Sequence, residues 1–199
     1  MTLPIAVCVS GRGTNLQALI DAIAQGRLDA RIVFVAASRK STPALDRAIA
    51  AGIPCRAFPP AANGGREAAQ TLMAAAIVSE GAELVVLAGY DRILCDAFFE
   101  RLGGVPVINI HPSLLPAFGR LNGVAVHEAV LAAGVTETGA TVHRARAGTV
   151  DEGEILLQRA VAVHAGDTVE TLAARVLAVE HEILVEAVAR FASRSAVAG

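Results

Sequence analysis

Two polar residues with complementary chemistry, Asn109 and His111, stand two positions apart at the end of the apolar run Val105–Ile110. An amide N–H and a protonated imidazole N–H can together stabilise the negative charge that develops on a carbonyl oxygen during acyl transfer. A free imidazole is mostly neutral near neutral pH, so a carboxylate must lie nearby to keep it protonated. We expect Asp151, in the glycine-containing connection 148–154, to supply that carboxylate or to order a water that relays protons.

A second candidate site is the glycine-rich turn Ser10–Asn15, which separates the first apolar run from a segment with helical spacing. Gly11 and Gly13 allow a ligand to approach the backbone closely, while Thr14 and Asn15 add donors or cap the helix. Backbone N–H groups at a helix N-terminus attract anions, so we expect a monophosphate to bind here.

Both sites have plainer interpretations. The turn lacks the third glycine of dinucleotide-binding loops and the Gly-Lys-Ser/Thr ending of nucleotide loops, so it is equally well a tight turn that binds nothing. His111 could be a strand-end histidine that hydrogen-bonds to the following loop. Asp151 could belong to a solvated acidic loop. No GxSxG motif is present, and none of the cysteines has a histidine next to it in the sequence to act as a general base. A covalent nucleophile is therefore not indicated.

The surrounding pattern predicts the elements that would position these residues. Four continuous apolar runs are bounded by Gly, Pro or Ser, at Ile5–Val9, Ile32–Ala37, Leu84–Ala88 and Val105–Ile110. Segments with helical spacing lie between the first three, at Asn15–Ala24, Pro43–Ala51 and Arg66–Ser79. Continuous apolarity predicts strands covered on both faces, hence an α/β fold with a doubly wound, mostly parallel sheet and helices on both faces. Ligands bind at the carboxyl edge of such sheets, so both candidate sites should share one cleft.

The remainder of the chain continues less regularly. A long irregular stretch follows His111, and a helix is expected at Val126–Ala133. Two further strands are predicted at Thr138–Arg144 and Ile155–Val163, and an amphipathic helix at Thr168–Phe191. We expect residues 1–199 to form a single domain, because no linker or repeat divides them.

Composition narrows the possible partners. Of the 199 residues 54% are hydrophobic, and 17 Lys and Arg against 19 Asp and Glu give a net charge of -2, so nucleic acid is not an expected partner. No apolar run reaches the roughly 18 residues that a membrane span needs. The N-terminus lacks the basic segment of a secretion signal, and the three cysteines form no CxxC pair, which indicates a cytoplasmic location and no bound metal.

Three sequence blocks carry a resemblance to a known family. Ser-Gly-Arg-Gly-Thr-Asn at 10–15, Leu-Ala-Gly-Tyr-Asp-Arg-Ile-Leu at 87–94 and Asn-Ile-His-Pro-Ser-Leu-Leu-Pro at 109–116 resemble the phosphoribosylglycinamide formyltransferases of purine biosynthesis, and the resemblance spans nearly the whole chain. It implies a Rossmann-type N-terminal half and formyl transfer from 10-formyltetrahydrofolate to the amine of 5-phosphoribosylglycinamide. Asn109 and His111 would be the catalytic pair, and Asp151 would raise the pKa of the histidine.

The same resemblance implies how the ligands are held. The half of the chain at about 1–104 would bind the phosphosugar, and the half at about 105–199 would carry catalysis and a folate loop. The implied substrate-binding residues are Gly11, Gly13, Thr14, Asn15 and Glu180. The implied folate-binding residues are Arg66, Asp91, Arg92, Ile93, Leu94 and Asn109. Asp91 is a departure, because many relatives have an apolar residue at that position.

Two alternatives use the same residues. A hydrolase that releases formate from 10-formyltetrahydrofolate needs no change at the catalytic trio, although such hydrolases usually carry an extra N-terminal domain and a His-His-Ser version of the motif. A module that binds a phosphorylated metabolite without catalysis would need only the glycine-rich turn. The expected partners are small-molecule substrates, and the chain is expected to be a monomer or a homodimer.

Overall fold

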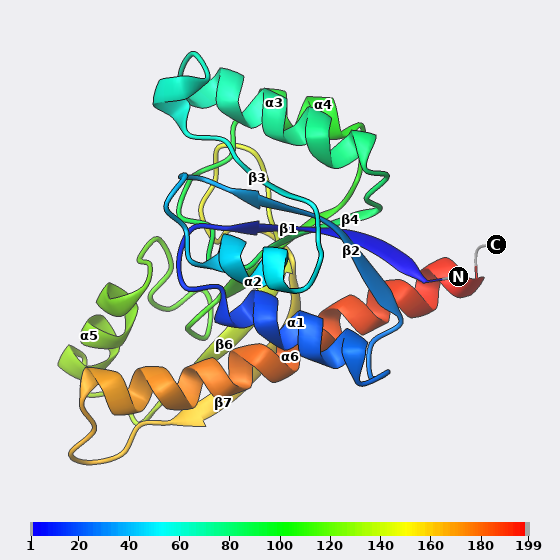
Figure 1. The fold of residues 1–199 in the computed structure, drawn as a ribbon. Helices are drawn as coiled ribbons and strands as arrows, with labels where there is room; N and C mark the ends of the chain where they lie inside the picture. The colour runs from blue at the N-terminus through cyan, green and yellow to red at the C-terminus, as the bar shows by residue number, and fades with distance from the viewer. Residues whose placement is uncertain (1, 198–199) are drawn as a thin grey trace.

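The computed structural model describes residues 2–197 and contains one seven-stranded sheet with helices on both sides (Figure 1). Its strands are β1 (Leu3–Val9), β2 (Ala30–Ala37), β3 (Cys55–Ala57), β4 (Leu84–Leu87), β5 (Val107–His111), β6 (Glu137–Arg144) and β7 (Ile155–Ala162). The spatial order is β3-β2-β1-β4-β5-β6-β7. The first five strands pair in parallel, whereas β6 runs antiparallel to β5 and β7 antiparallel to β6.

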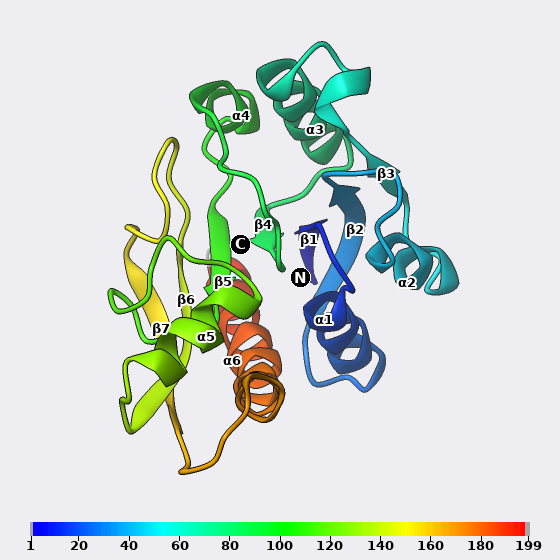
Figure 2. The same cartoon turned by 90° about the vertical axis from the view of Figure 1, so that its left-hand side faces the viewer.

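The helices divide between the two faces of the sheet. They are α1 (Thr14–Ala24), α2 (Ala44–Ala50), α3 (Arg66–Ser79), α4 (Asp96–Leu102), α5 (Val124–Ala132) and α6 (Val169–Val197), with a short 3₁₀ helix at Pro60–Ala62. Figures 1 and 2 show α3 and α4 together on one side and α1 and α6 on the other. The predicted α/β fold, with a mostly parallel sheet covered on both faces, is therefore confirmed.

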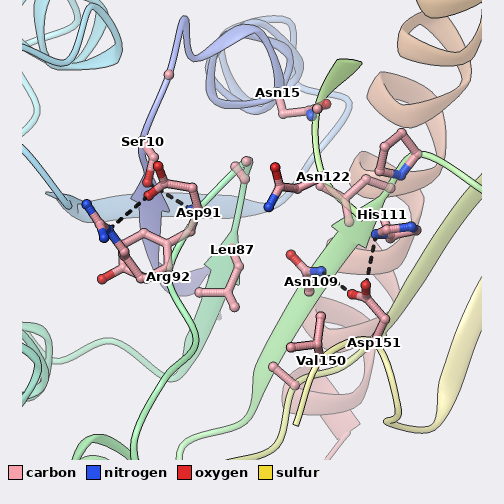
Figure 3. Close-up of a pocket in the computed structure, with 18 of the residues that line it drawn as sticks. Ser10, Asn15, Leu87, Asp91, Arg92, Asn109, His111, Asn122, Val150 and Asp151 are labelled. Atoms are coloured by element: carbon pink, nitrogen blue, oxygen red, sulfur yellow. Dashed lines mark hydrogen bonds and ion pairs between the residues drawn. The ribbon is translucent and has the colours of Figure 1, made fainter. Parts of the chain in front are cut away.

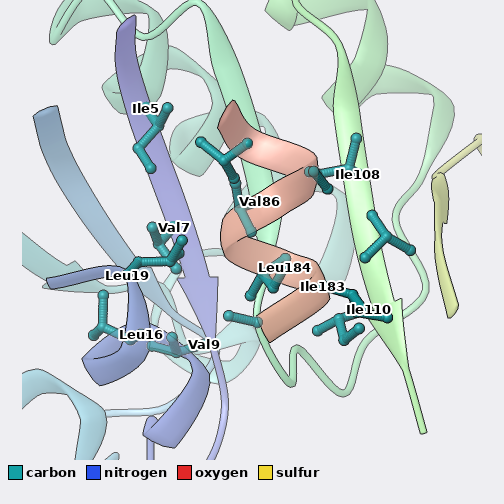
Figure 4. Close-up of a cluster of buried hydrophobic side chains, with 14 of the residues drawn as sticks. Ile5, Val7, Val9, Leu16, Leu19, Val86, Ile108, Ile110, Ile183 and Leu184 are labelled. Atoms are coloured by element: carbon teal, nitrogen blue, oxygen red, sulfur yellow. The ribbon is translucent and has the colours of Figure 1, made fainter. Parts of the chain in front are cut away.

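The core is buried on both faces because side chains alternate along the central strands. Ile5 and Val7 of β1 pack beneath α1 and α6, where they meet Leu19 and Leu184 (Figure 4). Ala6, which lies between Ile5 and Val7, faces the second cluster, together with residues of α3 and α4. Each fully buried aliphatic side chain of this size contributes about 1.5–3 kcal/mol, so the continuous apolar runs that indicate strands are also what hold the layers together.

The predicted strands and helices are all present, and most of their ends lie within two residues of the expected ones. The long C-terminal helix extends further than expected, to Val197. Three short elements were not predicted, namely β3, the 3₁₀ helix and α4. Each has seven residues or fewer, too short to display the periodicity on which sequence interpretation depends. The described helices include none that is long and apolar enough to cross a membrane.

Gly139 of β6 offers a stability test of the pairing between β6 and β7. A Cβ atom at this position would lie 2.2 Å from the carbonyl oxygen of Arg159 and 2.6 Å from Cδ2 of Leu114. We expect Gly139→Ala to lower the free energy of unfolding by about 3 kcal/mol or more, measured by urea denaturation, because the backbone of β7 must move. The control Gly11→Ala, whose Cβ meets nothing within 4 Å, should change it by less than about 0.5 kcal/mol. Equal stability of the two variants would contradict this account of the sheet.

Candidate active site

One cleft of about 490 Å³ opens at the carboxyl ends of β1, β4 and β5, and both candidate sites face it (Figure 3). Its walls come from five parts of the chain, namely the turn 10–15, the segments 87–94 and 109–112, the loop around 120–124, and residues 143–153. Three residues of α6, Ala173, Leu177 and Glu180, also line it, as do Arg39 and His127. A volume of this size is typical of sites for small-molecule ligands.

Asn109, His111 and Asp151 meet on one side of this cleft. Nδ1 of His111 lies 3.2 Å from Oδ2 of Asp151, and Nδ2 of Asn109 lies 3.4 Å from Oδ1 of the same carboxylate (Figure 3). The alternation of β5 places Asn109 and His111 on the same side of the strand, as its period of two requires. The three groups are therefore close enough to act on one bound acyl group.

Asp151 reaches this position through an unusual backbone conformation. Its φ is 57°, and Phe118 and Arg120, in the facing loop, also have positive φ values of 57° and 67°. The backbone N–H of Arg120 donates to Oδ2 of Asp151 at 3.0 Å, which joins the two loops. The backbone at Gly153 passes close to that of Arg144, and only glycine fits there, because a Cβ atom at position 153 would lie 1.7 Å from the carbonyl oxygen of Arg144.

His143 of β6 completes the group. It lies opposite Asn109 in the pairing of β5 with β6, and its Nε2 is 3.1 Å from Nδ2 of Asn109. Its Nδ1 is 3.0 Å from the carbonyl oxygen of Arg144, and its Nε2 is also 3.3 Å from Oδ1 of Asp151, so the ring contacts the amide and the carboxylate together. His143 thereby orients the amide, and only the antiparallel register of β6, which the sequence did not reveal, identifies this role.

The electrostatics of His111 differ from the expectation. Burial lowers the pKa of His111 below its ordinary value, and the opposing effects of the Asp151 carboxylate and the Phe118 carbonyl only partly offset it. Burial acts to raise the pKa of Asp151, but hydrogen bonding to His143 and the charge of His111 outweigh it, so that pKa is lowered. The expected rise in the pKa of His111 is thus not found, because its side chain is only 4% exposed.

The glycine-rich turn presents free backbone donors to the other end of the cleft. Gly13 has a φ of 74° and packs so closely on α2 that a Cβ would lie 2.5 Å from Cβ of Ala44. Arg47 holds the turn from outside by donating from Nε to the carbonyl oxygen of Arg12 at 2.9 Å. The N-terminus of α1 has no side-chain cap and no acidic residue in its first turn, which leaves its N–H groups available to an anion.

Asn15 does not cap α1, because its side chain bonds to α6. Its Nδ2 donates to Oε2 of Glu180 at 2.7 Å, and its Oδ1 is buried with no partner among residues 2–197. Burial raises the pKa of Glu180, although the bond from Asn15 opposes this effect. The pair therefore presents an oriented carboxyl group and an unused amide oxygen next to the turn.

The residues implied by the resemblance fall into two groups. All of the implied substrate-binding residues line the cleft, namely Gly11, Gly13, Thr14, Asn15 and Glu180. So do the implied folate-binding residues Asp91, Arg92, Ile93, Leu94 and Asn109. Arg66 is the exception, because it is exposed at the start of α3 and does not line the cleft. Over the described part of the chain, no group of three or more His, Cys, Asp or Glu residues is arranged to hold a metal ion.

Comparisons with known proteins match nearly the whole described chain. A family model described as formyl transferase matches residues 3–188. The chain is 42% identical to the phosphoribosylglycinamide formyltransferase of Mycobacterium tuberculosis, over 95% of this chain and 85% of that protein. The crystal structure of glycinamide ribonucleotide transformylase 1 from Symbiobacterium toebii has a TM-score of 0.89 and 42% identity, and the match covers 96% of this chain and 88% of that one.

Some relatives are much longer. The chain is 44% identical to the trifunctional purine biosynthetic protein adenosine-3 of Bos taurus over 95% of its own residues, but it spans only 18% of that protein. The match therefore concerns one part of a larger protein.

The contact between His111 and Asp151 predicts how His111 titrates. Because the carboxylate favours the protonated ring, Asp151→Asn should lower the pKa of His111 further, so that the imidazolium persists only at more acidic pH. NMR titration of the imidazole carbons of His111 in the parent protein and in the variant would measure the change. An unchanged or raised pKa of His111 in the variant would remove Asp151 from this role.

Proposed function

Because the chain belongs to the formyl transferase family, among the phosphoribosylglycinamide formyltransferases, we propose that it transfers a formyl group from 10-formyltetrahydrofolate to the amine of 5-phosphoribosylglycinamide. The observation that carries the proposal is the shared cleft. It joins a pair of donors suited to a nascent oxyanion, Asn109 and His111, to an uncapped helix N-terminus suited to a phosphate. The proposed enzyme, which would act in one-carbon metabolism and purine biosynthesis, needs both the donor pair and the phosphate site. The two must lie no further apart than the length of one phosphosugar.

The proposed reaction is direct attack by the substrate's amine on the formyl carbon. A new C–N bond forms, the bond from the formyl carbon to N10 of the folate breaks, and the proton released by the amine goes to the departing nitrogen. Asn109 donates an N–H to the developing oxyanion, and His111 in its protonated form donates a second. Burial lowers the pKa of His111, whereas the Asp151 carboxylate opposes this effect and stabilises the charge on the ring when it is protonated.

One contact constrains this mechanism. Nε2 of His111 lies 3.2 Å from the carbonyl oxygen of Phe118, so both ring nitrogens already face acceptors. Donation from Nε2 to an oxyanion requires this carbonyl to share the proton or to move aside. The loop 117–123 is therefore proposed to adjust when substrates bind.

A third part of the cleft fits the folate. Leu87, Leu94 and Val150 supply apolar surface for a flat ring, and the backbone from 91 to 94 supplies hydrogen-bonding groups. We propose that Asp91, Arg92, Ile93 and Leu94 line this site with Asn109, and that Arg92 meets the folate's carboxylates. The substrate's ribose or glycinamide end would contact Glu180, and the phosphate would contact Gly11, Gly13, Thr14 and Asn15. Arg66 is left out because it lies outside the cleft.

The organisation of the protein is proposed on the same basis. Residues 1–199 would work as one domain, in which about 1–104 bind the phosphosugar and about 105–199 supply catalysis and the folate loop. A cytoplasmic location is consistent with the three free cysteines. The protein would act on small molecules as a monomer or a homodimer.

Incubation of the purified protein with 10-formyltetrahydrofolate, with and without 5-phosphoribosylglycinamide, tests the function directly. We expect tetrahydrofolate and the formylated amide to form together, and only when the amine is present, as followed by mass spectrometry. Formate release without the amine would instead identify a hydrolase. Absence of deformylation in both mixtures would leave only the binding module.

Substitution of the donor pair tests the mechanism. Asn109→Ala should lower kcat roughly 10²- to 10³-fold, because one donor to the oxyanion is lost. His111→Ala should abolish most turnover while affinity for ribose 5-phosphate stays within about a few-fold, since the phosphate site lies elsewhere in the cleft. His164→Ala, on an exposed turn, controls for the loss of a histidine. Normal turnover by either catalytic variant would refute the mechanism.

A further inference from the structure

We propose that Arg39, held by Asp91 beside the Ser10–Asn15 turn, is a further ligand of the substrate's phosphate. The inference rests on the proposed function, because it extends the phosphate site by one residue from a different strand. Neither Arg39 nor its neighbour Ser38 was singled out from the sequence, and both follow the carboxyl end of β2. Arg39 lines the same cleft as the turn.

Hydrogen bonds place the base of Arg39 next to the turn. The backbone N–H of Ser38 donates to the carbonyl oxygen of Val9 at 3.2 Å, and the Ser38 hydroxyl lies 2.8 Å from that of Ser10. Ser10 directly precedes Gly11, where the turn begins. Arg39 therefore leaves the backbone one residue beyond a buried contact with the turn itself, and its long side chain need not cross the cleft to reach a bound phosphate.

Asp91 sets the direction of the arginine. Nη2 of Arg39 forms an ion pair with Oδ2 of Asp91, and Oδ1 of Asp91 accepts a hydrogen bond from Ser38 at 3.2 Å. The backbone N–H of Asp91 donates to the Ser10 hydroxyl at 3.0 Å. Many relatives have an apolar residue at the position of Asp91. In this chain the Asp91 carboxylate turns to the β2 side of the cleft and orients Arg39.

The charges around the turn support a phosphate rather than a folate carboxylate as the ligand. The wall that α6 presents to the cleft consists of Ala173, Leu177 and Glu180, which supply no cation. The Asp91 carboxylate next to the turn would repel a phosphate, and Arg39 offsets that charge together with Arg92, whose Nε lies 3.6 Å from Oδ1 of Asp91. Within residues 2–197 the other guanidinium donors of Arg39 have no hydrogen-bond acceptor, so they are free to bind phosphate oxygens.

Calorimetric titration with ribose 5-phosphate tests the proposal without depending on formyl transfer. We expect Arg39→Ala to weaken binding roughly ten-fold, and Arg39→Lys to weaken it less because the charge is kept. The double variant Arg39→Ala with Asp91→Asn should recover about half of the loss on a logarithmic scale, because the carboxylate no longer repels the phosphate. Arg101→Ala, on the exposed face of α4 and outside the cleft, should change affinity by less than about two-fold.

Each alternative result has a defined meaning. Unchanged affinity in Arg39→Ala, or no binding of ribose 5-phosphate by the parent protein, overturns the proposal. A double variant as weak as Arg39→Ala overturns the part assigned to Asp91. In turnover assays, a raised KM for the folate with an unchanged KM for the phosphosugar would assign Arg39 to the folate and also overturn it. If the protein transfers no formyl group but binding of ribose 5-phosphate still depends on Arg39, the role of Arg39 in phosphate binding is upheld and the proposed function is refuted.

Discussion

The buried carboxylate of Asp151 is the interaction on which the candidate site depends. Its side chain is only 7% exposed, and a carboxylate so far from water needs partners that favour its charge. His111, His143 and the backbone N–H of Arg120 supply them from β5, from β6 and from the loop that precedes α5. Removal of any one partner leaves charge uncompensated, so the three segments must be positioned together. The site is therefore a product of the tertiary fold rather than of any single motif.

The change from parallel to antiparallel pairing beyond β5 makes this convergence possible. The parallel strands direct their carboxyl ends, and the turn after β1, to one edge of the sheet. Because β6 returns in the opposite direction, it places His143 directly beside Asn109, and the connection to β7 brings Asp151 back over the end of β5. The parallel part thus provides the anion site, while the antiparallel part provides the groups that orient the amide and the imidazole.

How much the sequence reveals follows from the range of each signal. The alternation that places Asn109 and His111 on one side is local, and so is the glycine pattern of the first turn, so both are predictable. The role of His143 depends on the register between two strands, and the pairing of Arg39 with Asp91 joins residues 52 positions apart, so neither has a local signature. Arg66 is assigned to the folate by resemblance alone. Resemblance does not reveal whether the helix that begins at Arg66 directs this side chain into the cleft. The pKa of His111 depends on burial, which outweighs the one carboxylate that the sequence suggested.

The left-handed backbone at Phe118, Arg120 and Asp151 has a consequence for heat resistance. Side chains in that conformation cost about 1–2 kcal/mol each relative to ordinary backbone, and only contacts with the surrounding structure keep them there. The free energy needed to open these two loops locally is therefore smaller than that needed to unfold the apolar layers that enclose the sheet. Warming should misalign the carboxylate and the imidazole while the strands are still intact, so that inactivation precedes melting.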